Sequence, residues 1–524
     1  GEQDSETTYH ESARRYDLAA VILCTAVCLL ALAIGYFHRI GDFGVESDFY
    51  GAYGPQADNL RTGVPYTYHF HPPGYMLLLA ALTKLTGLST FAAGKVLSAL
   101  AAALIGAMTY LTFKTLYDAR VALAGTMLLL VALVPYSFIA SNDLVGAGTM
   151  LVPIWMALRP SRRWLLKCFL VGLFAGIAYL VRTNALVIVG GLGLGLLFLD
   201  TSEPRFRRRV VGAALLAAGF FLVTSPWLAF NWRSSGSPFS STHYLQSAAH
   251  FHHPEGDMWG ANSMSMGTRF HSLTEVILYD PVKVVKTYVK DVVLFYPAQL
   301  FQQALKFPAV LFAGAGLFLL LPTITRRRLM YVIPLLFVYA IAGLVGFYAR
   351  YYVVLFPVLF FTVAYFAFHK GVLSSFERVT ARTTLVAWAL CLAIALLLAY
   401  QSYDEVTNRI GNEPRYLLDL AHVLRERAAK PGELAVAPPH LTYTAGMRRS
   451  ELRATTPEEY AEKARAEGSR YIYYSEWEER IYPGIRVLSD PSNLPGDFRL
   501  IWRHDPSKTL VYEIVSPSGA GRAN

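Results

Sequence analysis

Long apolar runs constrain this chain more than any other feature. They recur along the first 400 residues, and many are long enough to cross a hydrocarbon layer of about 30 Å. Hydrophobic residues make up 54% of the chain and charged residues only 16%, a balance that favours burial in lipid over a water-soluble core. The pattern predicts a polytopic α-helical membrane protein.

The net charge of +10 also fits a polytopic membrane protein. The basic residues cluster in short segments between apolar runs, as in the cytoplasmic loops of membrane proteins, so nucleic acid is not an expected partner. All four cysteines lie within apolar runs, where packing is favoured over disulfide or metal chemistry. They are Cys24, Cys28, Cys168 and Cys391.

Charge also predicts orientation. Arg14 and Arg15 precede the first apolar run, which places the N-terminus in the cytoplasm. We expect about eleven spans in the cell (inner) membrane, with the C-terminus on the outer side. Their ranges are 18–38, 91–114, 121–140, 144–158, 165–180, 185–199, 210–230, 307–322, 329–347, 353–368 and 383–400. The apolar run at 72–87 is short for a crossing and predicts a juxtamembrane helix outside.

The expected domains follow from these spans. Residues 1–400 form a transmembrane domain with a first outer loop, 39–90, and a large outer loop, 231–306. The large loop contains an expected amphipathic helix at 281–296, with valines at helical spacing. In residues 401–524, charged helices alternate with β-rich runs, which predicts a small extracytoplasmic α/β domain. The helices are expected at 414–430 and 456–468, and the strands at 433–437, 470–475, 498–503 and 509–515.

The first outer loop has the composition of an active site. Residues 46–75 read ESDFYGAYGPQADNLRTGVPYTYHFHPPGY, a mixture of acids, histidines and tyrosines that a lipid-facing helix does not tolerate. The predicted topology brings further polar residues to the same outer level. This set is Asp48, His69, His71, Asp143, Arg182 and Arg350. Cations suit a phosphate group, and a carboxylate can accept a proton.

The order of these features resembles the C-fold (GT-C) glycosyltransferases, polytopic enzymes that use polyprenyl-phosphate sugars and include the protein O-mannosyltransferases and the lipid A aminoarabinose transferase. The matching residues of the first outer loop are Asp48, Tyr50 or Tyr53, Ala57, Gly63 and Pro72-Pro73. Later matches are Asp143 at the start of a span, Pro226-Trp227 with Asn231, and Arg350-Tyr351 with Pro357. One departure is that Phe70 and His71 stand where related lipid A transferases have Glu-Lys.

The resemblance implies an inverting sugar transfer from a polyprenyl-phosphate donor to an acceptor hydroxyl on a glycan, lipid or protein. Asp48 would be the general base. The implied substrate-binding residues are Asp143, His71, Tyr50, Tyr53, Arg182, Arg350 and Tyr351. A divalent cation (Mg, Mn or Zn) at Asp48 and Asp143 is a further expectation that the resemblance leaves open.

Simpler interpretations stay open for most of these residues. Asp48 and Asp143 could cap helices, and Arg182 and Arg350 could anchor span ends at the interface. His71 could satisfy local backbone groups. A histidine-rich set in the large outer loop could bind metal, although its spacing is unlike a zinc site and favours a solvated loop. That set is His243, His250, His252, His253 and Asp257.

The sequence is also compatible with three rival functions. A secondary transporter would place ionisable residues near the middle of the bilayer, whereas here they gather at one outer level. A polysaccharide ligase or polymerase of another fold would also use a polyprenyl-linked donor. A receptor or scaffold would have no transfer activity at all.

Overall fold

The computed structural model describes residues 2–67, 71–200, 202–203, 205–252, 266–376, 380, 382–427, 434–450, 454, 456–481 and 483–515. The chain divides into two compact units. The first comprises Gly1–His38, Gln56–Ser247 and Thr274–Gly411, and the second comprises Arg39–Pro55, Ala248–Leu273 and Asn412–Asn524. A division at residue 400 therefore misses two segments of the predicted outer loops, because these pack with the C-terminal part of the chain.

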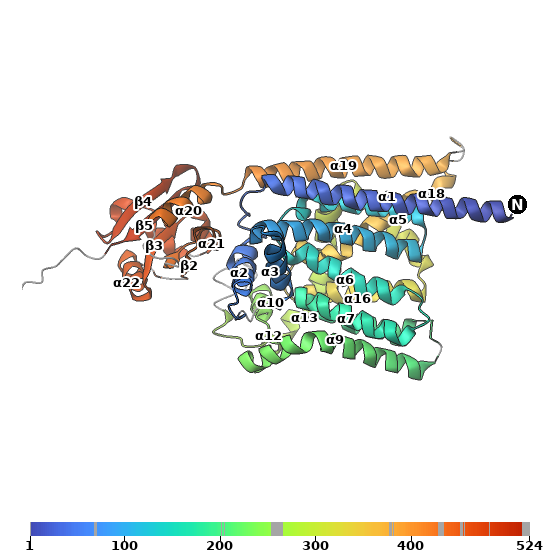
Figure 1. Ribbon diagram of the computed structural model, residues 1–524, viewed down its shortest axis with the longest axis horizontal. Helices are drawn as coiled ribbons and strands as arrows, with labels where there is room; N and C mark the ends of the chain where they lie inside the picture. The colour runs from blue at the N-terminus through green and yellow to red at the C-terminus, as the bar shows by residue number, and fades with distance from the viewer. Residues whose placement is uncertain are drawn as a thin grey trace, which may run out of the picture. The chain divides into compact units, whose positions relative to one another are not determined.

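The first unit is a bundle of long apolar helices (Figure 1). Every predicted span contains a helix. The bounds are α1 (Glu2–Phe37), α4 (Thr90–Leu116), α5 (Ala119–Ser137), α6 (Asn142–Leu158), α7 (Trp164–Val181), α8 (Leu186–Leu194) with η3 (Gly195–Leu199), α9 (Phe206–Ser235), α15 (Ala309–Leu320), α16 (Arg326–Ala342), α17 (Phe356–Phe368) and α19 (Thr383–Gly411). Within the described residues, seven helices are long and apolar enough to cross a membrane, which confirms a polytopic membrane protein. The number and direction of the crossings stay predictions.

Polar side chains and glycines shape this bundle. The hydroxyl groups of Ser89 and Thr325 accept backbone N–H hydrogen bonds at the starts of α4 and α16 and so fix where these helices begin. Small residues allow close helix packing. A Cβ atom on Gly172 of α7 would lie 1.9 Å from the carbonyl oxygen of Leu216 in α9, so only glycine fits at this contact.

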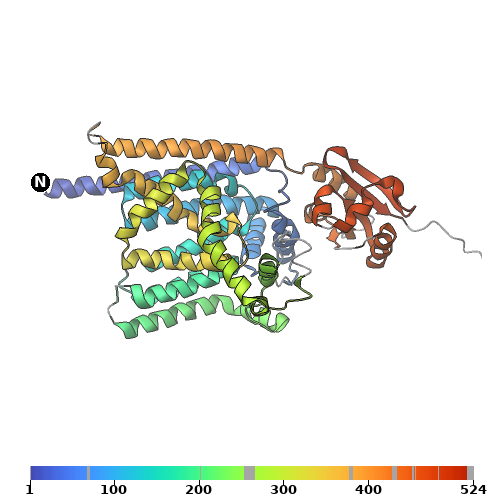
Figure 2. The same ribbon diagram turned by 180° about the vertical axis from the view of Figure 1, so that it is seen from behind.

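Shorter helices connect the long ones. They are α2 (Gly54–Arg61), α3 (Gly74–Thr86), η2 (Thr183–Ala185), α10 (His243–His252), α12 (Leu273–Tyr279), α13 (Pro281–Lys290), η4 (Asp291–Phe295), α14 (Tyr296–Leu300), η5 (Phe301–Leu305), η6 (Leu321–Thr323), η7 (Ala349–Leu355) and α18 (Lys370–Ser374). The helix α3 has 13 residues, as expected for a run too short to cross. Seen from behind, the segment from α13 to η5 runs across the long helices (Figure 2). The valines of α13 that were predicted to share a face are exposed, with Val282 at 76%.

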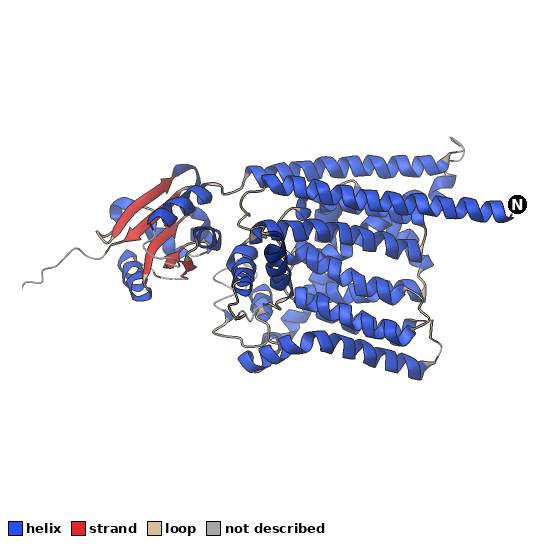
Figure 3. Cartoon of the chain, in the orientation of Figure 1, coloured by secondary structure: helices blue, strands red, loops and turns tan. Residues whose placement is uncertain are grey.

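The C-terminal part of the second unit is the predicted α/β domain, with a mixed sheet (red in Figure 3). The helices are α20 (Tyr416–Arg427), α21 (Pro439–Ala445), α22 (Pro457–Glu467) and α23 (Glu476–Ile481), with η8 (Pro483–Leu488), η9 (Pro491–Asn493) and η10 (Asp505–Ser507). The strands are β1 (Leu434–Val436), β2 (Arg448–Arg449), β3 (Ser469–Tyr474), β4 (Phe498–His504) and β5 (Thr509–Ile514). Their order is β2-β1-β3-β5-β4, with β1 parallel to β2 and β3, and β5 antiparallel to β3 and β4.

The core of this domain lies between the sheet and its helices. Ile472 of β3 is directly opposite Tyr512 of β5, and both pack with Tyr460 of α22. The buried Glu513 of β5 pairs with Arg470 and Arg499 from the neighbouring strands, which compensates its charge. The alternation of helices and strands in the sequence was therefore a correct guide to this domain.

Candidate active site

The first turn of α6 presents a buried carboxylate. Ser141 is the capping residue: its hydroxyl oxygen accepts the Asp143 N–H at 3.0 Å and its hydroxyl group donates to Asp143 Oδ2 at 2.6 Å. Asp143 therefore does not cap the helix, because Ser141 already does so. Its side chain, only 7% exposed, is available for a different partner.

That partner is Arg182, which directly follows α7. The guanidinium group forms an ion pair with Asp143 Oδ1 and donates to Asn142 Oδ1 at 2.9 Å. A Cβ atom on Gly146 would lie 2.7 Å from Arg182 Cδ, so this glycine leaves the space that the arginine occupies. The Arg182 side chain is 12% exposed, which places it in a buried ion pair instead of at a lipid-facing span end.

The helix η7 adds a second arginine and an aromatic ring. The guanidinium carbons of Arg182 and Arg350 lie 5.2 Å and 5.4 Å from the centre of the Tyr351 ring. Arg350 is also close enough to act electrostatically on Asp143 and His71. Two guanidinium groups and one carboxylate give this region an excess of positive charge, which favours an anion.

Two histidines complete the group. The rings of His71 and His243 lie 6.1 Å apart, measured between their centres. Burial, followed by the charges of His243, Arg182 and Arg350, lowers the pKa of His71 to about 3. His71 is therefore neutral at neutral pH without a ligand, and a bound anion would offset the nearby positive charges. We call His71, Asp143, Arg182, His243, Arg350 and Tyr351 the Arg182 cluster.

The sequence predicted most of this cluster. His71, Asp143, Arg182, Arg350 and Tyr351 were all proposed as substrate contacts, and the structure brings them together within the first unit. His243 was assigned to a metal-like set instead. Its place beside His71 depends on the folding of a loop more than 170 residues away, which no local pattern reveals.

Asp48 and the two tyrosines near it belong to the second unit. Asp48 precedes the short helix η1 (Phe49–Tyr53) and is partly exposed, and its side chain makes no capping hydrogen bond to that helix. Tyr50 and Tyr53 are 5% and 4% exposed, and the Tyr50 hydroxyl accepts the Gly41 N–H at 3.0 Å. The burial of these tyrosines fits a packing role, and a substrate contact for either stays a prediction.

A divalent cation at Asp48 and Asp143 stays a prediction. One of the Asp143 carboxylate oxygens pairs with Arg182 and the other accepts from Ser141, so a cation there would share these oxygens with both partners. Across the described ranges, no three His, Cys, Asp or Glu side chains gather in a group able to hold a metal ion. His69, His253 and Asp257 lie outside those ranges. A metal in the histidine-rich loop likewise stays a prediction.

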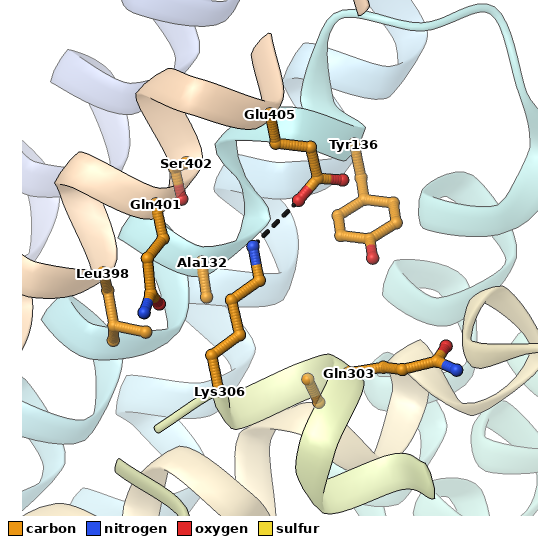
Figure 4. A pocket seen from close by; sticks show the side chains of 9 residues that line it. Ala132, Tyr136, Gln303, Lys306, Leu398, Gln401, Ser402 and Glu405 are labelled. Atoms are coloured by element: carbon orange, nitrogen blue, oxygen red, sulfur yellow. Dashed lines mark hydrogen bonds and ion pairs between the residues drawn. The ribbon is translucent and has the colours of Figure 1, made fainter. Parts of the chain in front are cut away.

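A separate polar pocket lies between α5, η5 and α19 (Figure 4). Lys306 Nζ and Glu405 Oε2 are 3.0 Å apart in it, and Arg409 reaches the other oxygen of Glu405 at 3.7 Å. The Ser402 hydroxyl donates to the Val131 carbonyl oxygen at 3.0 Å, which ties α19 to α5. These contacts describe a structural link between helices.

Comparisons with known proteins identify the class. A sequence profile described as dolichyl-phosphate-mannose-protein mannosyltransferase matches residues 70–230. The structure is similar to ArnT from Cupriavidus metallidurans in the apo state, with a TM-score of 0.60 at 15% identity, over 94% of this chain and 98% of that one. The same enzyme bound to undecaprenyl phosphate gives a TM-score of 0.56 at 14% identity, over 95% and 98% of the two chains.

The oligosaccharyltransferase AglB from Archaeoglobus fulgidus, in complex with an inhibitory peptide and a dolichol-phosphate, gives a TM-score of 0.55 at 13% identity, over 88% of this chain and 71% of that one. No curated protein sequence matches the chain. The protein therefore has the GT-C glycosyltransferase fold. Within this class it resembles ArnT and the protein O-mannosyltransferases.

Proposed function

We propose that this protein transfers a sugar from a polyprenyl-phosphate donor to an acceptor hydroxyl, with inversion at the anomeric carbon, at the outer face of the cytoplasmic membrane. In this proposal the N-terminus is cytoplasmic and the C-terminal domain is outside. The donor class agrees with the undecaprenyl phosphate and dolichol-phosphate bound by the structural neighbours.

The observation that carries the proposal is the excess positive charge of the Arg182 cluster. Arg182 is held by Asp143, so its guanidinium group is already oriented before a ligand arrives. Arg350 adds a second positive charge, since its guanidinium group contacts the same Tyr351 ring as that of Arg182. Such a site suits the phosphate of the donor, and it stabilises the charge that develops on that phosphate as the sugar leaves.

Asp48 is the proposed general base. Its carboxylate accepts the proton of the acceptor hydroxyl while that oxygen forms a bond to the anomeric carbon. The bond between the anomeric carbon and the phosphate oxygen breaks on the opposite face, and polyprenyl phosphate departs with the electron pair. Phosphate is a good leaving group, so no strong general acid is required.

The GT-C fold also separates the rival functions. A ligase or polymerase of another fold is not consistent with the similarity to ArnT over nearly the whole chain. In the first unit, the charged groups described here gather at helix ends, where the Arg182 cluster joins the start of α6, the end of α7 and the helix η7. This arrangement fits a single site better than a path across the membrane.

Replacement of Asp48 tests the proposal. The protein would be purified in lipid nanodiscs and supplied with a panel of labelled polyprenyl-phosphate sugars, and release of polyprenyl phosphate would be measured. Asp48→Asn should lower turnover by about 10² to 10⁴, the usual contribution of a general base. Asp58→Asn is the matched control, because Asp58 lies in the same predicted loop but pairs with Arg61 and Thr90. Turnover of Asp48→Asn within twofold of the native protein would rule out the assigned base.

A further inference from the structure

The segment Arg39–Pro55, which carries Asp48, is folded as part of the C-terminal unit. Its backbone is bound at the first residue: the Arg39 N–H lies 3.3 Å from both carboxylate oxygens of Glu413. The side chain of Glu413 is only 1% exposed, and Arg415 Nε donates to it at 2.9 Å. The two ends of this contact are 374 residues apart in the sequence.

His440 holds the next part of the segment. Its Nε2 atom lies 2.8 Å from the carbonyl oxygen of Asp42. Because a carbonyl oxygen only accepts, Nε2 must carry a proton, and a second proton on Nδ1 would be a buried donor without an acceptor. Nδ1 is buried and has no hydrogen-bond partner among the described residues, so the imidazole is held in one neutral form. Burial lowers the pKa of His440 to about 4, which agrees with that form.

Aromatic packing also fixes the segment Arg39–Pro55. The Tyr50 ring lies 4.3 Å from the His440 ring, and the Phe43 ring stacks on Trp477 at 4.8 Å, measured between ring centres. The helix η1 packs on α21, where Phe49 meets Tyr443. Glu46, Phe49, Tyr50 and Tyr53 are buried, whereas Asp48 is partly exposed. The residues around Asp48 are thus fixed by these contacts.

We propose that the C-terminal domain positions the Asp48 carboxylate, and that His440 is the central positioning residue through its hydrogen bond to Asp42 and its contact with Tyr50. The inference rests on the proposed function in one respect, the role of Asp48 as base. The domain would then act on the rate of transfer by holding a remote loop, without itself touching donor or acceptor.

The test combines kinetics with hydrogen–deuterium exchange of the full-length protein in nanodiscs. His440→Phe keeps an aromatic ring but loses the donor, so exchange of peptides covering Arg39–Pro55 should rise about tenfold or more while β3 and β5 stay protected. The kcat should fall about 10²-fold, the cost of a misplacement of roughly 1 Å, and the donor KM should stay within about twofold. His440→Gln, which can still donate to the Asp42 carbonyl, should recover most of the kcat.

His504→Gln is the matched control, because His504 lies in the same domain and stacks on Tyr416 and Trp502. Unchanged exchange of Arg39–Pro55 in His440→Phe, or raised exchange with native kcat, would overturn the inference. If β3 and β5 also lose protection in His440→Phe, that variant is misfolded and His440→Gln provides the test. Native exchange of Arg39–Pro55 in His440→Gln together with a low kcat would also overturn the inference. Failure of the proposed function is recognised separately, since Asp48→Asn would then remain active whatever the exchange of the loop.

Discussion

The Arg182 cluster and the Asp48 segment use opposite means to hold a carboxylate. Asp143 is buried and fixed by charge, through the guanidinium group of Arg182 and the hydroxyl group of Ser141. Asp48 is partly exposed, and the residues around it are fixed by aromatic packing and by backbone hydrogen bonds to His440 and Glu413. A carboxylate held by a cation stays ionised and organises that cation, whereas the carboxylate of a partly exposed residue can exchange a proton with a substrate.

Removal of the buried charge of Asp143 should have the largest effect. Asp143→Leu leaves Arg182 buried without its partner and should destabilise the protein by about 3 to 5 kcal/mol, with loss of transfer. The double variant Asp143→Leu with Arg182→Met should recover most of the stability, because no lone charge remains, but none of the transfer. Thermal unfolding in nanodiscs and the turnover assay measure the two effects. Recovery of transfer in the double variant would show that the pair is structural only.

Arg350 should affect donor binding more than stability. Arg350→Ala removes a charged contact to phosphate worth about 1.5 to 3 kcal/mol, so the Kd for polyprenyl phosphate should rise roughly 10- to 100-fold. Arg350→Lys keeps the charge and should lie in between. Binding is measured by titration of undecaprenyl phosphate into nanodiscs. An unchanged Kd for Arg350→Ala would place the phosphate elsewhere.

His71 and His440 should respond differently to an anion. The pKa of His71 is lowered to about 3 and that of His440 to about 4 in the folded protein. As the pH falls, each histidine is therefore protonated at a higher pH in the unfolded state than in the folded state. Their contribution to stability is therefore full above the unfolded pKa of about 6.5 and is lost as the pH falls toward the folded value.

Arg182 and Arg350 help to lower the pKa of His71, whereas burial dominates at His440 and the nearby acids Asp42 and Glu46 partly counter it. Undecaprenyl phosphate should thus reduce the loss of stability at low pH that His71 causes, and it should not change the loss that His440 causes. The test measures the melting temperature of the native protein, His71→Gln and His440→Gln between pH 7 and pH 4.5, with and without the lipid. An equal effect of the lipid on both losses would contradict an anion site at His71.

The smallest effect is expected at Glu405, in the pocket of Figure 4. Its partner Lys306 is 33% exposed, and Glu405 itself is 31% exposed. Such a partly solvated pair contributes about 0 to 1 kcal/mol, so Glu405→Gln should lower stability by no more than this and leave transfer unchanged. A loss of transfer in Glu405→Gln would mean that the pocket takes part in the reaction and that the Arg182 cluster is not the whole site.

The sequence predicted the helices of the spans and the strands β1, β3, β4 and β5 because their signals are local, and it missed β2, α21 and α23. Runs such as 91–114 and 509–515 contain their own hydrophobic pattern, and α4 and β5 lie where that pattern placed them. The meeting of His71, Asp143 and Arg350 could also be predicted, since the charge of the connecting turns assigned all three to one side of the membrane. Asp48 as general base stays a prediction until it is measured.

The partners within each site could not be predicted in the same way. Ser141 as the cap of α6, Gly146 as the space for Arg182, and His243 beside His71 all depend on side chains from different elements. The same holds for the contact between His440 and Asp42. By itself, the sequence determined a polytopic membrane protein with an α/β domain, because hydrophobic periodicity and charge act over a few turns. Tertiary structure alone decided which groups meet across hundreds of residues, and hence that the C-terminal domain holds the segment bearing Asp48.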